Sequence, residues 1–213
     1  SAFISGKFIQ NDHDPGEFNA HKHLLINAFL SHDAAQVLSS CEMISQLDDK
    51  TIGQLSLDDD FVDSLIEAVN NLDELPLKTK ILLIQVLDSV ISNSQETTIC
   101  KFIEEVGITL SSILNSSIDE IDSETEGENL PLLPLTIKLF QVICVNASYG
   151  RSAMISFGIL DSILILMSKK IDDDAVLIHC LLLIRSIIRK GSQTMKKSSS
   201  FSVSRSSTMT TEK

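Results

Sequence analysis

Apolar side chains recur three and four positions apart through most of the chain, a spacing that is typical of amphipathic helices. The first such stretch covers residues 21–30, and the second covers residues 33–47, with Ser31 or Asp33 as its N-cap. The Asp-Asp-Lys triplet at residues 48–50 is expected to turn the chain. Strands would show alternation with a period of two, and the sequence has none, so it predicts an all-α fold.

A repeated pattern of helices begins after residue 57. Three segments start with a bulky apolar residue, continue as a short amphipathic helix and end in an acidic loop. They are residues 61–74, 106–120 and 157–173. A longer and more apolar helix follows each of them, at residues 78–94, 135–148 and 174–192. Two of the three segments have glycine in second position, Gly107 and Gly158, and a turn is expected at both.

Prolines and one further glycine set the expected limits of the long helices. Pro76 and Pro134 are expected just before two of them, and Gly191 is expected to end the last. The connection at residues 116–131 is longer than its counterparts and rich in Asp, Glu and Ser. It is therefore predicted to be a mobile insertion that offers an acidic docking loop.

The repetition itself predicts a stacked arrangement. One helix pair cannot bury its apolar face alone, whereas stacked copies bury a continuous core between them. The sequence therefore predicts an irregular N-terminal segment and capping helices within residues 1–57, stacked repeats over residues 58–191, and a Ser/Thr-rich basic tail at 192–213 with too few apolar residues to fold. An irregular helical bundle is the alternative arrangement.

The repeated unit resembles the armadillo repeat, whose long third helix is followed by a short loop, a glycine turn and the second helix of the next unit. Residues 86–116 are similar to this pattern, and residues 142–168 are similar to it with a shorter connection. The apolar positions are shared with HEAT-type repeats, so the glycines are the more specific part. The resemblance implies a right-handed superhelical solenoid of about three to four repeats.

The resemblance also implies a binding surface. Armadillo proteins often bind extended peptides along a concave groove lined by their third helices, and nuclear-import receptors of this type carry Trp and Asn there. The equivalent groove positions in this chain are Gln85, Ser89, Gln141, Val145, Leu182 and Ser186. Because none of them is Trp or Asn, clamping of nuclear localisation peptides is not expected. For Val145 and Leu182, packing against the next helix is the favoured interpretation.

The charge of the chain narrows the choice of partner. The formal net charge is −12, and the tail after residue 190 is basic, so the preceding body is more acidic still. An anionic body repels phosphate backbones and anionic lipid, which argues against nucleic acid and membrane surfaces. A basic protein or peptide is the partner that the charge favours.

Cysteine usage predicts the compartment. Cys41, Cys100, Cys144 and Cys180 are far apart, form no CxxC pair and, for three of them, lie in apolar helical runs. Buried free thiols in a reducing compartment explain this pattern, so a cytoplasmic location is predicted, with the nucleus as the alternative. No signal peptide or bilayer-length apolar run is visible, and the first residue, Ser1, suggests a fragment of a larger protein.

The candidate catalytic and metal-binding residues have simpler explanations. His21 and His23 face apart on a helix, and His179 is predicted to be a hydrogen-bonded core residue beside Cys180 rather than its catalytic partner. Three acidic runs lack the spacing of a calcium loop and are expected at helix N-termini, where they favour the helix dipole. These runs begin at Asp58, Asp119 and Asp172. No enzyme activity, metal or cofactor is predicted.

The basic tail suggests regulation. Ser200 and Thr208 follow the basic residues Lys196, Lys197 and Arg205 at distances that suit basophilic kinases. The alternative is that the basic tail folds back into the acidic groove of its own chain or of a neighbour.

The predicted function is that of a non-enzymatic protein-binding module that forms part of a larger scaffold. The sequence is also compatible with two alternatives. One is a structural or oligomerisation segment whose apolar helices pack against other chains. The other is a cytoskeletal or small-GTPase effector domain, since formin regulatory regions contain armadillo repeats.

Overall fold

A computed structural model of the chain describes residues 15–121, 129–169 and 173–189. Within these ranges the regular elements are ten α-helices and two short 3₁₀ helices, with no strand. The predicted all-α class is therefore confirmed for the described residues. Gly191, Ser200 and Thr208 lie outside them, as do the tail and residues 122–124 of the acidic run at 119–124.

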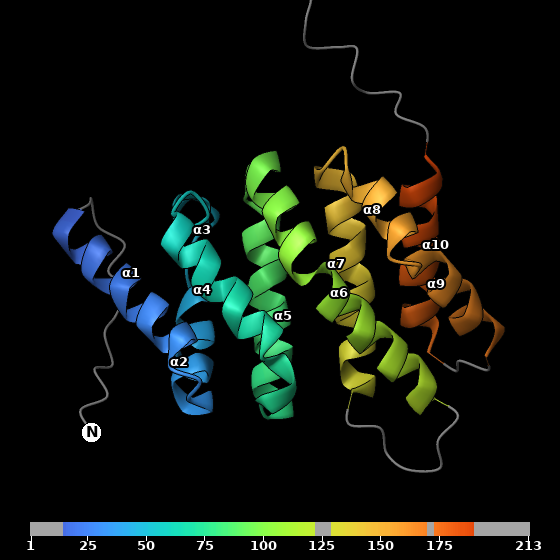
Figure 1. Ribbon diagram of the computed structural model, residues 1–213, viewed down its shortest axis with the longest axis horizontal. Helices are drawn as coiled ribbons and strands as arrows, with labels where there is room; N and C mark the ends of the chain where they lie inside the picture. The colour runs from blue at the N-terminus through green and yellow to red at the C-terminus, as the bar shows by residue number, and fades with distance from the viewer. Residues whose placement is uncertain (1–14, 122–128, 170–172, 190–213) are drawn as a thin grey trace, which may run out of the picture.

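The longer helices form two rows that cross each other (Figure 1). The first row contains α1 (Pro15–Leu30), α4 (Asp59–Asn70), α6 (Glu96–Glu120) and α9 (Ile159–Ser168). The second row contains α2 (Ala34–Ile44), α5 (Leu77–Ser92), α7 (Leu133–Asn146) and α10 (Asp174–Ile188). In each row every helix packs against the next one. Four shorter helices complete the fold, namely α3 (Asp49–Leu55), α8 (Gly150–Ser156), η1 (Leu72–Glu74) and η2 (Leu130–Leu132).

One continuous hydrophobic core lies between the rows and extends from Leu25 in α1 to Ile187 in α10. It is mostly aliphatic, as the low aromatic content requires. Phenylalanines are fully buried in α1, α4, α6 and α7, and the rings of Phe29 and Phe61 lie 6.1 Å apart. The helices at 15–44 share this core with the later ones, so the first row begins at α1 and the second at α2.

Aspartates cap four of the helices. Asp33, Asp48, Asp58 and Asp173 each accept a hydrogen bond from a backbone N–H in the first turn of α2, α3, α4 and α10, respectively. Asp33 is one of the two caps predicted for the second helix. The prediction that residues 48–50 only turn the chain is wrong, because the Asp48 carboxylate accepts from Thr51 N–H at 2.8 Å and starts α3.

Helix α6 corrects two further predictions. Gly107 was expected in a turn, yet α6 continues through it without a break. A Cβ atom at this position would lie 2.5 Å from the ring of Phe157, so the glycine is needed for close packing against the α8–α9 turn. Residues 116–120 were expected in a mobile insertion but form the last turns of α6, where Ser117 and Ile118 are buried.

The acidic runs are only partly where they were expected. Asp58 caps α4, and Asp59 and Asp60 lie in its first turn, as predicted. Asp119 and Glu120 instead end α6, where the helix dipole disfavours them. Glu120 compensates by accepting hydrogen bonds from the backbone and side-chain nitrogens of Asn129 at 2.8 and 3.0 Å, which fixes the start of η2.

The segment between α7 and α9 contains the expected glycine turn and an unexpected helix. Gly158 has a φ of +71° and precedes α9, so the turn predicted at this glycine is confirmed. No pattern in the sequence indicated α8, which has only seven residues. Pro134 lies inside the first turn of α7 rather than before it, where a missing N–H does no harm. Pro76 is the N-cap residue of α5, as expected.

Candidate functional site

The predicted groove positions lie on α5, α7 and α10, three successive helices of the second row. Gln85 is exposed, and Ser89, Gln141, Leu182 and Ser186 are half-buried. Val145 is 67% exposed, so packing against the next helix, the favoured interpretation for this residue, is wrong. The Ser186 hydroxyl donates to the Leu182 carbonyl at 2.8 Å, which leaves it as an acceptor for a partner.

Two ion pairs join neighbouring helices of the second row near these positions. Lys138 of α7 contacts the Asp88 carboxylate of α5 at 2.8 Å, beside Gln141 and Ser89. Lys78 of α5 contacts Glu42 of α2 at 3.1 Å. The Asp88 Oδ1 atom is buried, and no described residue hydrogen-bonds to it. The surface therefore has fixed charges that sequence reasoning missed, because such pairs depend on the register between helices.

The first row has ion pairs of the same kind. Lys22 of α1 contacts the N-cap carboxylate of Asp58 in α4, and Lys101 of α6 contacts Asp63 of α4. Burial would by itself raise the pKa of Asp58. The hydrogen bonds from Lys22 and the Phe61 N–H, together with the charges of Lys22 and His23, outweigh burial and hold the pKa below its usual value. Each of these four lysines thus links adjacent helices within one row.

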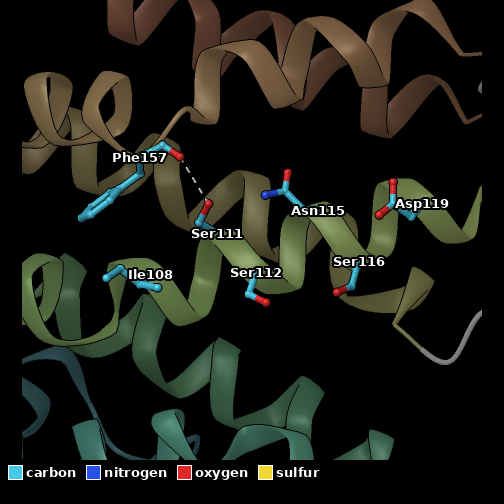
Figure 2. A pocket seen from close by; sticks show the side chains of 7 residues that line it. All are labelled: Ile108, Ser111, Ser112, Asn115, Ser116, Asp119 and Phe157. Carbon is cyan, nitrogen blue, oxygen red and sulfur yellow. Dashed lines mark hydrogen bonds between the residues drawn. The ribbon is translucent and has the colours of Figure 1, made fainter.

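A shallow hollow of about 400 Å³ lies along α6 where the α8–α9 turn meets it (Figure 2). The Ser111 hydroxyl lies 3.4 Å from the Phe157 carbonyl oxygen, to which it donates, and Asn115 accepts from the Ser162 hydroxyl at 2.7 Å. The residues that line it are Ile108, Ser111, Ser112, Asn115, Ser116, Asp119 and Phe157. A pattern in the sequence indicated this polar surface. The polar residues of α6 that line the hollow are separated by alternating steps of one and three residues, which places them on one side of the helix.

The lining of this hollow does not form a catalytic arrangement. Its titratable side chain is the Asp119 carboxylate, and its serines have no histidine or lysine beside them to act as a base. Hydroxyl and amide groups of this kind can hydrogen-bond to a polypeptide backbone. The hollow therefore suits a weak polar contact rather than a reaction.

The thiols are unsuited to nucleophilic chemistry. Burial raises the pKa of Cys41 and Cys144 to about 12 and that of Cys180 to about 11. Burial also raises the pKa of the half-buried Cys100. All four are free cysteines, as the sequence predicted. A thiolate is therefore disfavoured at neutral pH at each of these positions.

His179 differs in one respect from its predicted role. It was expected to be hydrogen-bonded, but its Nδ1 atom is buried and no described residue is its partner. Ala175, Leu182 and Leu183 occupy the neighbouring turns of α10 and have no polar side-chain group.

Within the described residues, no group of three or more His, Cys, Asp or Glu side chains is arranged to hold a metal ion.

No single described helix is both long and apolar enough to cross a bilayer. Together α8 and α9 meet those two criteria, with a bend of 66° between them.

Comparisons of this chain with protein-family models, with curated proteins and with solved structures found no match.

Proposed function

We propose that this chain is a non-enzymatic module that binds a basic, extended protein segment across the exposed side of α5, α7 and α10. The observation that supports it is the second row itself. Three successive helices carry the groove positions at equivalent places, and four of these six side chains are polar. A partner lying across the row can therefore meet a similar contact on each helix.

We also propose that the two rows form a right-handed armadillo-type superhelix. In its support, a short, a medium and a long helix occur in order as α3, α4 and α5, and again as α8, α9 and α10. Between these two units, α6 takes the place of the first two helices and α7 that of the third. The described helices thus give about three repeats, preceded by the pair α1 and α2.

Electrostatics supports a basic partner. Acidic side chains outnumber basic ones by 29 to 17, which attracts cationic segments and accelerates their association. Asp88 lies beside the groove position Ser89, and its carboxylate already holds a lysine ammonium at 2.8 Å. A lysine or arginine of the partner can therefore replace Lys138 as the cation that pairs with this carboxylate. We place this activity in the cytoplasm or nucleus, where the buried cysteines stay reduced.

A charge-reversal experiment tests the groove. The probe is a synthetic peptide of alternating lysine and serine, with a glutamate–serine peptide for comparison, measured by fluorescence anisotropy at low and physiological salt. Gln85→Arg combined with Gln141→Arg should raise the Kd for the basic peptide about tenfold, because both changes place like charge beside it. The glutamate–serine peptide should not bind to the unmodified chain.

Gln46→Arg combined with Gln54→Arg is the charge-matched control, since both glutamines are exposed and lie outside α5, α7 and α10. It should change the Kd far less than the groove double variant does. Equal weakening by both would mean that only net charge matters, and the groove assignment would then be wrong. Equal binding of both peptides would remove the proposed preference for basic partners.

A further inference from the structure

The last helix of each row exposes large aliphatic side chains. Leu164 and Ile165 of α9 are 53% and 55% exposed, and Ile178, Leu181 and Ile188 of α10 are 55%, 55% and 66% exposed. In the described part of the chain, the main packing partners of α9 and α10 are each other and α6, α7 and α8, which precede them (Figure 1). Stacked helical proteins stay soluble when their terminal units have a polar outer face. The five exposed aliphatic side chains make the outer face of this terminal unit partly apolar instead.

The exposed residues of α10 follow a regular spacing. Asp174, Ile178, Leu181, Arg185 and Ile188 are separated by steps of four, three, four and three, and all five are exposed. Steps of three and four place side chains on one line along a helix, which is the seam through which two helices pack in a coiled coil. We refer to these five residues as the α10 seam. It is apolar at three positions and carries opposite charges at the other two.

The order of charges on the α10 seam favours a second copy of this chain as the occupant. When two copies of the helix run antiparallel with Ile178 opposite the partner copy's Leu181, the two-fold axis lies between residues 179 and 180. The same axis places Asp174 of each copy opposite Arg185 of the other copy, which gives two such ion pairs. A parallel pairing would instead set Asp174 against Asp174 and Arg185 against Arg185. The seam is therefore complementary to itself in the antiparallel orientation.

We propose that this chain forms a two-fold symmetric dimer through antiparallel packing of α10 against α10 of a second copy, with α9 at the edge of the contact. Each Ile178–Leu181 contact removes apolar surface from water, and this burial drives association. Each Asp174–Arg185 contact fixes orientation and register. Because the contact uses the same patch on both copies, it closes at two and does not grow into a fibre. The seam lies on α10 beside the groove positions Leu182 and Ser186, whereas Gln85 and Gln141 lie on α5 and α7, so a peptide can contact those two helices while α10 is in the dimer.

The apolar part of the proposal is tested by light scattering and sedimentation over a range of chain concentrations. The unmodified chain should be a dimer, and Ile178→Arg should raise its dissociation constant at least about tenfold, because the new charge would be buried against an apolar side chain. Ile108→Arg is the matched control, since Ile108 is 73% exposed on α6, away from the seam. It should leave the dimer intact. Circular dichroism and thermal midpoints establish that both variants fold.

The orientation is tested by exchanging charges. Asp174→Arg alone and Arg185→Asp alone should each weaken the dimer about tenfold or more, because each sets like charges opposite one another. The double variant, Asp174→Arg with Arg185→Asp, should restore the original dissociation constant. Failure to restore it would rule out the antiparallel register.

Other occupants of this face give different results. A monomer at every concentration would overturn the proposal, as expected if another protein or further helices cover the face. Assemblies that keep growing with concentration would also overturn it, since they would indicate head-to-tail contact with α1, where Leu24 is 59% exposed. Neither result would bear on peptide binding at the groove, so this proposal and the proposed function fail independently.

Discussion

At the scale of single residues, Gly107 shows how packing can decide what a local signal means. Glycine within a helical pattern usually suggests a turn or a helix end, and this expectation failed at Gly107 and held at Gly158. The difference lies in the surroundings. Gly158 needs its positive φ, whereas Gly107 has helical geometry and lies directly against the Phe157 ring. The sequence could not distinguish them, because Phe157 is 50 positions away in the chain.

Replacing Gly107 tests this explanation. Gly107→Ala should stabilise an isolated helix by about 1 kcal/mol through its better helix propensity. In the folded chain we expect a net loss of about 1–2 kcal/mol, because overpacking against Phe157 outweighs that gain. Urea unfolding followed by circular dichroism measures the change.

A double-mutant cycle separates the clash from other effects. With Phe157→Leu in the background, the same Gly107→Ala change should become neutral or stabilising, since the ring that opposes the new methyl group is gone. If the loss were the same in both backgrounds, contact with Phe157 would not explain the glycine.

At the scale of elements, the sequence predicts helices well where they are long and capped. Helices α4, α5 and α10 have clear apolar stripes and end near the predicted residues, and Asp33 caps α2 as expected. Helices α3 and α8 were missed because seven residues are too few to establish a period. The groove positions could be named in advance, while the Lys138–Asp88 pair and the hollow along α6 depend on distances between helices.

Asp58 offers a test of one helix end, because it caps α4 and also contacts Lys22 of α1. Asp58→Ala should lower the free energy of unfolding by about 1–2 kcal/mol, since it removes the cap and leaves Lys22 without this partner. Asp60→Ala is the matched control. It lies in the first turn of α4 without capping it, and it should cost only a few tenths of a kcal/mol.

The same residue gives a pH dependence with a defined sign. The pKa of Asp58 in the folded chain is below its ordinary value of 3.8, so the folded state favours the ionised form. Its contribution is therefore fully present above about pH 4 and is lost as pH falls through the folded-state pKa. Unfolding curves of the unmodified chain and of Asp58→Ala should converge in acid. A constant gap between them down to pH 2 would contradict this explanation.

At the scale of the whole molecule, stability should depend on position along the rows. In the described part, α5 and α7 contact helices on both sides, whereas α10 contacts neighbours on one side only. In stacked folds each unit is stabilised mainly by contacts with its neighbours. A destabilising substitution in a unit with two neighbours therefore weakens more of the chain than one in a terminal unit. Central helices should therefore unfold only when most of the chain unfolds, whereas α10 should unfold locally at a lower free-energy cost.

Two truncations of buried residues measure this difference. Leu87 of α5 is fully buried, and Leu87→Ala should cost about 2–5 kcal/mol and lower amide protection from hydrogen exchange in both rows. Ile187 of α10 is 8% exposed, and Ile187→Ala should cost less and lower protection mainly in α9 and α10. Exchange is followed by mass spectrometry on peptides from each helix, below the concentration at which the chain dimerises. If both variants lowered protection uniformly, the two rows would unfold as one unit, and stacking by neighbour contacts would not describe this molecule.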